Sequence, residues 1–546
     1  MKIGLSVIVN LSEKSTASIF AYVALSIISG LSGFGFIVLV NSIIAFSISD
    51  PNSAISVDFS IMFVGLILAF FLTRRLLSGG IINLSQNIYW NLRKDIVKQV
   101  IKAPYDKVKE HKNEIYSTLT NDVGSITQAS LLIIDFITSI VLIIASLIYM
   151  AYVSMVMFGI SLGAIILGIV AYQLMTVNGN KRFNKVRDLE RSFMNYFNAI
   201  LGGAKEISVD PSKGEHIYNK RLEVVVNDGL SNNKKALIGF LNSQIVGQLL
   251  FYVLIAFVLL YAGSFFDIST AVIISYVFVL LYILGPIATV MMIIPVISRA
   301  RISLKRMVDL KKELGNIDTP NIAVKLDDDF SFSQLKFVDY EFEYPKSKFK
   351  IGPVNLSINK NEVIFIYGGN GSGKTTLINL ILNIYKPSQG NLSLNENALN
   401  EKDIQKVKAL FSVVLADFYL FDEFYGNENL NREKAKEYLK LFEIDDKVEV
   451  GETGFSSTDL STGQRKRLAL IAALLEQKPI LILDEWAADQ DPQFRAKFYL
   501  EIIPIIKKSG ITILAITHDD KYYQCADRLF KMEDGKLIGE NFSVKN

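Results

Sequence analysis

The chain has 546 residues, of which 50% are hydrophobic and only 20% are charged. Soluble globular proteins carry roughly 25% charged residues, so this composition is typical of a membrane protein and excludes a disordered one. The net charge of +3 is close to neutral, and we expect no nucleic-acid partner. A single cysteine, Cys525, excludes an intramolecular disulfide, and we expect it to be a packing residue.

Hydrophobic residues are concentrated before about residue 298, in six runs that are long enough to cross about 30 Å of hydrocarbon. The stretch 129–176 is too long for one span, so we predict two helices joined by a tight turn at 152–154. A cleaved signal peptide is the alternative for the first run, although its apolar core would be only about 7–15 residues long. The predicted spans are residues 18–46, 59–77, 129–152, 154–176, 241–266 and 271–297.

Basic residues are distributed unevenly between the loops. Segment 74–128 carries nine Lys or Arg and segment 177–238 carries eleven, whereas the loops around 47–58, 152–154 and 267–270 carry none. Loops rich in Lys and Arg stay on the cytoplasmic side of a membrane. We therefore expect both termini and both basic segments in the cytoplasm, with the basic segments extending the membrane helices.

Each basic segment contains a Pro or Gly break flanked by charges, near 104–116 and 203–218. Such a break can turn the chain back and leave a short exposed helix at the tip. This helix is either a docking element for a cytoplasmic domain or a solvated turn. The expected domains are 1–300 in the membrane, a charged linker at 301–330, and a soluble α/β domain at 331–546.

A glycine-rich loop follows a short β-rich run and precedes an apolar helical stretch, in the order that a P-loop requires. Backbone N–H groups of such a loop converge on phosphate oxygens, and the helix N-terminus adds the positive end of its dipole. The lysine supplies charge to the β- and γ-phosphates, and the hydroxyl of Thr375 is a Mg²⁺ ligand. The predicted nucleotide-binding residues here are Gly368, Gly369, Asn370, Gly371, Ser372, Gly373, Lys374, Thr375 and Thr376.

Two carboxylates, Asp484 and Glu485, end an apolar run that begins at Ile480. A buried strand of this kind delivers its last residues to the edge of a sheet where ligands bind. We expect Asp484 to hold Mg²⁺ and Glu485 to act as general base toward the attacking water. His518 follows another apolar run, and we expect it to contact the γ-phosphate at the same edge.

A further motif, Ser461-Thr462-Gly463-Gln464, precedes an apolar helix. Ser461 at the helix N-terminus can donate to phosphate, as can the amides that follow it. A plain helix cap is the alternative interpretation of this motif when it is taken alone.

Together these motifs resemble the nucleotide-binding domain of an ABC transporter, and the six spans ahead of it resemble an exporter half-transporter. The resemblance implies a multidomain membrane protein with a six-helix all-α transmembrane domain of the ABC exporter type and an α/β P-loop ATPase domain that binds ATP and Mg²⁺. By the family pattern, Tyr344 stacks on adenine and Asp491 is the D-loop aspartate. The signature residues Ser461, Thr462, Gly463 and Gln464 complete the site of the other subunit, which implies a homodimer.

The residues around the catalytic glutamate carry a finer resemblance. Glu485 is followed by Trp486-Ala487-Ala488-Asp489-Gln490-Asp491-Pro492, and Thr462 occupies the third signature position, as in the cyclic-peptide exporter subgroup. That subgroup includes transporters for pyoverdine precursors, syringomycin-type lipopeptides and the lasso peptide microcin J25. The resemblance implies ATP-driven export of a peptide-like molecule across the bacterial cytoplasmic membrane, and it allows an outer-membrane or periplasmic export partner. A lipid or lipid-linked glycan flippase and a non-transporting channel or regulator are the alternatives.

One departure from the family concerns the Q-loop, whose glutamine aligns with Ala416. Alanine has no metal-binding atom, so we expect nucleotide sensing there to be weaker or carried by water or Asp417. Within the spans, Asp135 is either a headgroup contact or a cargo contact. Gln244 and Gln248 recur four residues apart on the fifth span and either bond neighbouring helices or line the cargo path.

Overall fold

The computed structural model describes residues 16–49, 57–266, 268–315, 330–344, 349–400, 403–426 and 430–540. The chain forms two compact units, of which one contains Met1–Val97 and Asn113–Leu310 and the other contains Lys98–Lys112 and Lys311–Asn546. The centre of the predicted outer loop at 47–58 and residues 316–329 of the predicted linker lie outside the described residues.

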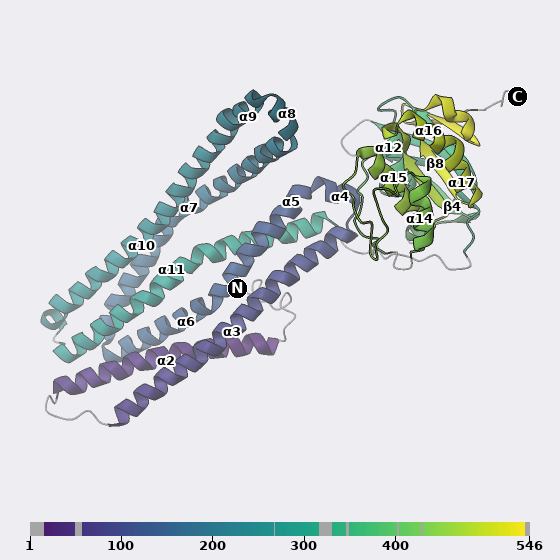
Figure 1. Cartoon of the computed structure of the whole chain (residues 1–546). Helices are drawn as coiled ribbons and strands as arrows, with labels where there is room; N and C mark the ends of the chain where they lie inside the picture. Colours follow the sequence, from purple (N-terminus) through teal and green to yellow (C-terminus); the bar gives the residue numbers. More distant parts are fainter. Residues whose placement is uncertain are drawn as a thin grey trace. The chain divides into compact units, whose positions relative to one another are not determined.

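Long helices build the first unit, as Figure 1 shows. Within the described residues, six helical segments have the length and hydropathy of membrane spans, which confirms the six predicted spans. The helices that carry them are α2 (Thr16–Ser49), α3 (Val57–Lys102), α6 (Val123–Val153), α7 (Met155–Gly202), α10 (Glu223–Phe266) and α11 (Thr270–Glu313).

Several helices continue far beyond their apolar runs, as the basic segments led us to expect. The helix α3 continues to Lys102, and α10 begins at Glu223, well before its apolar part. Residues 301–313, which we expected to open the linker, instead continue α11. Short helices mark the predicted chain reversals: α4 (Tyr105–Glu110), α5 (Lys112–Ser117), α8 (Ala204–Val209) and α9 (Pro211–Ile217).

The turn between the third and fourth spans is confirmed, and it is a single-residue break. Ser154 is extended, with φ −160° and ψ 114°, and its hydroxyl accepts a hydrogen bond from the Met157 amide at 3.4 Å. Because this cap satisfies an amide at the start of α7, the chain can reverse between two apolar helices without a longer polar loop.

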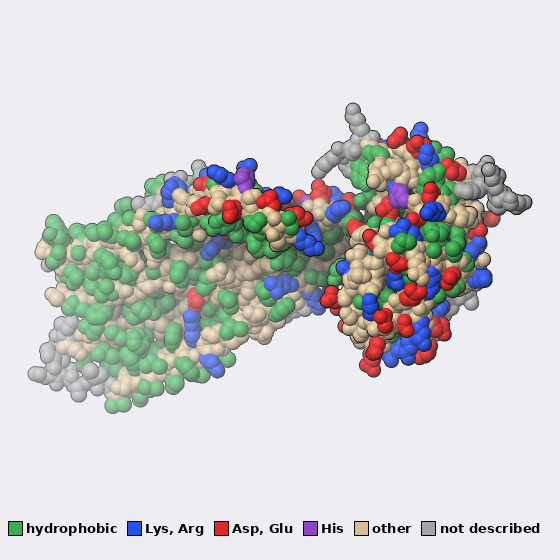
Figure 2. Space-filling model, turned by 45° about the horizontal axis from the view of Figure 1, so that its top comes forward, with side chains coloured by type: hydrophobic (Ala, Val, Ile, Leu, Met, Phe, Trp, Pro, Cys, Tyr) green, Lys and Arg blue, Asp and Glu red, His purple; other side chains and the backbone are tan. Residues whose placement is uncertain are grey.

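Side chains from α6, α7, α10 and α11 form the core of the first unit. Met150, Met157, Val258, Tyr276 and Ile283 are buried together there. Elsewhere on this unit, large apolar side chains remain exposed, and Figure 2 shows hydrophobic side chains covering much of the helical surface with few charges among them. This exposure fits a lipid-facing surface, because a monomeric soluble protein rarely exposes so much contiguous apolar area.

A six-stranded sheet in the order β10-β9-β3-β8-β7-β6 forms the centre of the second unit. A four-stranded antiparallel sheet, β2-β1-β4-β5, lies beside it in the same unit. The strands are β1 (Gln334–Glu343), β2 (Lys350–Asn359), β3 (Val363–Gly368), β4 (Gln389–Leu394), β5 (Asn397–Ala398), β6 (Phe411–Val414), β7 (Ile480–Asp484), β8 (Thr512–Ile516), β9 (Arg528–Glu533) and β10 (Lys536–Glu540).

Helices cover the six-stranded sheet, and its central strands β3, β8 and β7 are buried on both faces. Along β3, Val363 and Phe365 belong to one core while Ile364 and Ile366 belong to the other, as the alternation of side chains across a strand requires. The helices are α12 (Lys374–Ile381), α13 (Ile404–Lys408), α14 (Arg432–Leu441), α15 (Thr462–Leu475), α16 (Pro492–Lys497) and α17 (Ile503–Lys508), together with the 3₁₀ segments η4 (Trp486–Asp489) and η6 (Asp520–Cys525).

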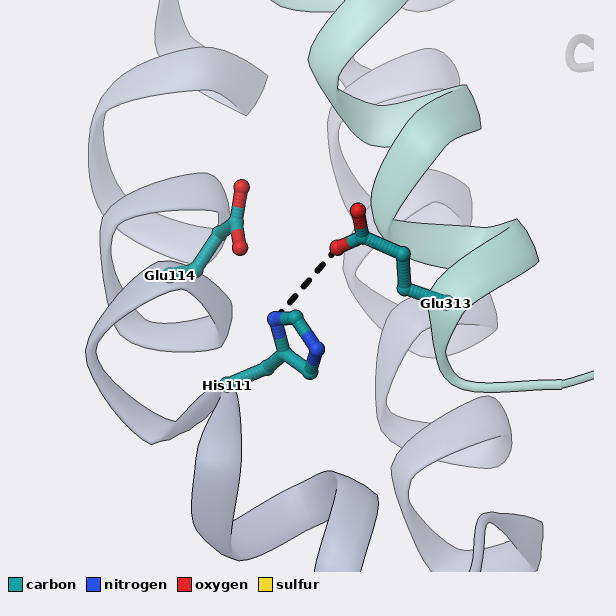
Figure 3. A group of neighbouring side chains, drawn as sticks. All are labelled: His111, Glu114 and Glu313. Atoms are coloured by element: carbon teal, nitrogen blue, oxygen red, sulfur yellow. Dashed lines mark ion pairs between the residues drawn. The ribbon is translucent and has the colours of Figure 1, made fainter. Parts of the chain in front are cut away.

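The segment Lys98–Lys112 belongs to the same compact unit as the two sheets. Within this unit, His111 Nδ1 lies 3.4 Å from a carboxylate oxygen of Glu313 at the end of α11 (Figure 3). Glu114, also drawn there, follows His111 by less than one helical turn. Membership of α4 in this unit supports the docking interpretation of the first chain reversal.

Candidate functional site: a nucleotide-binding centre

The P-loop needs glycine at positions where the structure leaves no room for a side chain. Gly368 ends β3, and a Cβ there would lie 2.2 Å from the Met532 carbonyl oxygen. Gly373 has φ +107°, and a Cβ there would lie 2.4 Å from Ile351 Cδ1. Gly371 is also left-handed, with φ +80°. These backbone angles turn the loop between β3 and α12, where amide groups can face an anion.

The lysine of this loop is held in place by the loop itself. Lys374 is 6% exposed, and its ammonium donates to the carbonyls of Gly368 at 3.0 Å and Gly369 at 3.1 Å. Its Nζ also lies 3.8 Å from Glu485 Oε1. The charge is therefore fixed at the N-terminus of α12, beside the carboxylate predicted as general base.

Asp484 has the properties of a metal ligand. It ends β7 and is 1% exposed, and among the described residues neither carboxylate oxygen has a hydrogen-bond partner within 3.5 Å, although the Thr375 hydroxyl and the Ala416 amide lie near it. Burial, and then the neighbouring Glu485, raise the pKa of Asp484, while the Thr375 hydroxyl and the Ala416 amide act in the opposite direction. Two unsatisfied buried oxygens next to a hydroxyl match the hard oxygen ligands that Mg²⁺ prefers, so these residues fit the ion.

The predicted base and the predicted γ-phosphate contact are brought together. In the parallel register Asp484 pairs with Ile516, so the residues that follow β7 and β8 emerge at one edge of the sheet. Glu485 Oε1 lies 3.1 Å from His518 Nε2, within hydrogen-bond distance. Glu485 itself has φ +49°, a left-handed conformation that costs about 1–3 kcal/mol for a residue with a side chain.

Tyr344 follows β1 and lies among other aromatic rings. Its hydroxyl is 3.0 Å from Thr376 Oγ1 on α12, and its ring meets those of Phe342 and Tyr385 edge-on. Burial, and then Tyr344, raise the pKa of Tyr385 to about 12, with smaller contributions from Tyr105 and Asp106. The bond to Thr376 thus places an aromatic ring next to the helix that begins at the P-loop.

The signature residues form a second bonded group. Ser461 caps α15: its hydroxyl accepts from the Gln464 amide at 3.4 Å, and the Gln464 side chain accepts from the Ser461 amide at 3.3 Å. A Cβ on Gly463 would lie 2.7 Å from the Asp489 carbonyl oxygen, so glycine is required there. Thr462 is the first residue of α15.

The side chain of Asp491 is bonded to α15, the helix that Ser461 caps. One carboxylate oxygen caps α16 by accepting from the Phe494 amide at 2.9 Å, and the other accepts from Arg467 at 2.9 Å. Arg467 also donates to Gln490 at 2.8 Å, and Gln490 donates to the Gly463 carbonyl at 3.0 Å. We did not predict these contacts of Arg467 and Gln490, although both residues lie within a few positions of the motifs: Arg467 is in a run of polar and basic residues, and Gln490 lies between two aspartates.

Comparisons with known proteins agree with this site and fold. The ABC transporter family matches residues 351–488, and the ABC transporter transmembrane region matches residues 19–287. ATP-binding protein SyrD of Pseudomonas syringae pv. syringae is 33% identical over 472 residues, covering 84% of this chain and 83% of SyrD. The chain therefore belongs to the ABC transporter family, as an exporter half-transporter whose ATPase domain couples ATP hydrolysis to transport.

Other relatives differ in what their names describe. An ATP-dependent lipid A-core flippase of Wigglesworthia glossinidia brevipalpis is 24% identical over 83% of this chain and 80% of its own length. The Lactococcin-A transport/processing ATP-binding protein LcnC of Lactococcus lactis subsp. lactis is 27% identical over 47% of this chain and 37% of its own. A bacterial Atm1-family ABC exporter with ATP bound has the same fold, with a TM-score of 0.78 at 16% identity, covering 96% of this chain and 95% of that chain.

Proposed function

We propose that this chain exports a peptide-like molecule across the bacterial cytoplasmic membrane, as a homodimer with two ATP–Mg²⁺ between its subunits. The cargo is a cyclic or lasso peptide, a lipopeptide or a peptide siderophore precursor. The similarity to SyrD along most of the chain, together with the partial similarity to a lactococcin transport protein, supports a peptide. Both termini face the cytoplasm, in keeping with the basic segments 74–128 and 177–238.

The observation that carries the ATPase mechanism is the cluster of Lys374, Glu485 and His518 at one edge of the sheet. Lys374 and the loop amides bind the phosphates, and Tyr344 stacks on the adenine. Thr375 and Asp484 would hold Mg²⁺, which when bound would supply positive charge to the phosphates.

Hydrolysis itself needs a base and an oriented phosphate. Glu485 accepts a proton from the attacking water while the water oxygen bonds to the γ-phosphorus and the bond to the ADP oxygen breaks. His518, within hydrogen-bond distance of that carboxylate, contacts the γ-phosphate. Ser461 and the amides of the signature contact the nucleotide bound by the other subunit, and Asp491 anchors the adjoining loop through Arg467.

A lipid flippase of the same architecture is the second candidate, because a lipid A-core flippase matches 83% of this chain. A phosphorylated headgroup would need a cation with free donors inside the membrane helices. Arg74, at the end of an apolar run, is already bonded to Asp135 at 2.6 Å. Of the two basic residues in the predicted spans, Arg74 and Arg75, the first thus has its charge paired, and this scarcity of unpaired positive charge favours the peptide over the lipid.

ATPase turnover of the purified dimer in lipid, with Glu485→Gln as the blank, tests both candidates. Cyclic peptides, lasso peptides, peptide siderophore precursors and lipids are titrated separately. We expect one peptide class to stimulate ATPase turnover of the wild type in a saturable way, and we expect Glu485→Gln to keep ATP bound without hydrolysing it. Stimulation by lipid alone would replace the peptide exporter with the flippase, and turnover or export by Glu485→Gln at the wild-type rate would remove Glu485 from its proposed role.

A further inference from the structure

A buried lysine links the signature helix to the residue proposed as general base. Lys466 is the fifth residue of α15 and is 4% exposed. Its ammonium donates to the main-chain carbonyl of Glu485 at 2.9 Å and pairs with the Asp489 carboxylate at 2.7 Å. Burying an ammonium costs several kcal/mol unless it is paired and hydrogen-bonded, so these two contacts account for its presence in the core.

The carbonyl that Lys466 binds belongs to a strained residue. Glu485 is left-handed, with φ +49°, and such a conformation persists only where the surroundings hold it. The Glu485 amide is held by the Ile516 carbonyl at 3.2 Å, and the Glu485 carbonyl is held by Lys466. With both ends of the residue held, the direction of its Cα–Cβ bond is set, and the contacts of the carboxylate with His518 at 3.1 Å and Lys374 at 3.8 Å then orient its end.

Two further contacts join the start of α15 to the turn that follows Glu485. The indole of Trp486, which is 1% exposed, donates to the Lys466 carbonyl at 2.8 Å. A Cβ on Gly463 would lie 2.7 Å from the Asp489 carbonyl, so the start of α15 is in contact with η4. The turn after Glu485 and the signature helix therefore form one interlocked piece, in which Lys466 supplies the charged contact.

We propose that Lys466 is a positioning residue for hydrolysis: it clamps the Glu485 carbonyl against Asp489 and so aims the Glu485 carboxylate. This inference rests on the proposed role of Glu485. Lys466 does not touch the nucleotide in this scheme, so its loss changes the rate of the chemical step and leaves ATP affinity in place. A general base misplaced by about 1 Å can lose about 100-fold in rate.

The test measures kcat and KM for ATP in lipid for Lys466→Met, Lys466→Arg and Asp489→Asn. We expect Lys466→Met to lower kcat about tenfold to a hundredfold with KM within about twofold, and Lys466→Arg to recover much of the loss because it keeps the charged donor. Asp489→Asn keeps the donor but removes its counter-charge, and its kcat should lie between those of Lys466→Met and the wild type. Lys497→Met is the matched control, since Lys497 is a partly buried lysine of the same domain that forms a 2.5 Å pair with Glu443, away from Glu485 in the sequence.

A second measurement separates positioning from a general effect on the fold. In a Glu485→Gln background, which traps ATP without turnover, Lys466→Met should leave the amount of trapped ATP unchanged, because Lys466 acts only through the base that is already disabled. Loss of trapped ATP in that background, or a wild-type kcat for Lys466→Met, would overturn the inference. Wild-type turnover of Glu485→Gln alone would instead overturn the proposed function. If Lys466→Met does not fold, a kcat for Asp489→Asn equal to that of the Lys497→Met control would also count against the clamp.

Discussion

Arg74 on α3 and Asp135 on α6 form an ion pair, with 2.6 Å between Nη2 and Oδ1, across 61 residues of sequence. Both side chains are partly exposed within the first unit. Asp135 therefore has a charged partner, which could not be predicted from its position in an apolar run. The pair also explains how an aspartate is tolerated there, because a lone charge in a membrane helix costs about 2.5–3.5 kcal/mol.

The pair predicts a specific pattern of stability. Arg74→Leu leaves Asp135 without its partner and should lower the free energy of unfolding by about 2–3 kcal/mol, whereas Asp135→Asn should cost less. The exchanged pair, Arg74→Asp with Asp135→Arg, should restore much of the loss. Thermal midpoints in lipid measure these changes, with Arg75→Leu on the same helix as the control. If Arg74→Leu had the same thermal midpoint as Arg75→Leu, the ion pair would contribute nothing to stability.

We expect the Asp484 carboxylate to lower the stability of the nucleotide-free protein, although ATP hydrolysis requires it. Its buried carboxylate oxygens have no hydrogen-bond partner among the described residues, so Asp484→Asn removes a desolvated charge from the apo protein. We expect a higher thermal midpoint without nucleotide, by about 1 kcal/mol or more in unfolding free energy, and turnover reduced about 100-fold or more. Differential scanning fluorimetry without nucleotide and an ATPase assay give the two readings. A lower midpoint for the variant would mean that the carboxylate stabilises the empty site.

Tyr344 should affect ATP affinity through its ring. Base–aromatic stacking contributes about 1–3 kcal/mol, so Tyr344→Ala should raise KM for ATP about tenfold with little change in kcat. Tyr344→Phe keeps the ring and removes the hydroxyl that bonds Thr376, so it should stay close to wild type. Steady-state kinetics with ATP for the three proteins measures both constants. Equal KM values for Tyr344→Ala and wild type would exclude stacking.

Cys525 offers a measurement on the only thiol of the chain. It is partly buried at the end of η6, and burial raises the pKa of its thiol. A raised pKa lowers the thiolate fraction at neutral pH, so maleimide should react with it more slowly than with free cysteine. The rate should increase as the pH rises toward the thiol pKa, and denatured protein should react at the rate of a free thiol. Fast labelling of the folded protein at pH 7 would contradict the packing role.

The sequence predicted features that are local in the chain. A glycine pattern such as 368–373 constrains its own backbone, and an apolar run ending in Asp484 predicts a buried strand by itself. The six membrane spans could also be predicted, because a span is recognised from the number of consecutive apolar residues. The first residues of the predicted linker, 301–313, continue α11, since their charged side chains are compatible with a helix that leaves the membrane.

Pairings between distant residues could not be read in this way. Arg74 and Asp135 meet only because α3 and α6 pack, and Lys466 reaches Glu485 only because α15 lies against the turn after β7. A lysine next to Arg465 and Arg467 in the sequence reads as a solvated basic cluster, yet the structure buries Lys466. Tertiary packing buries Lys466 and leaves Arg465 exposed, and the run of three basic residues does not by itself show which one is buried.

The contact between Lys466 and Glu485 has a kinetic consequence for the proposed homodimer. Each nucleotide there takes its base from one subunit and its signature serine from the other. Since α15 and the base-bearing turn are in close contact within a chain, we expect the residues that contact one γ-phosphate and the residue that activates water at the other to move together in that dimer. The proposal therefore predicts a direct connection between the two nucleotides through the ATPase domains, without passage through the membrane helices.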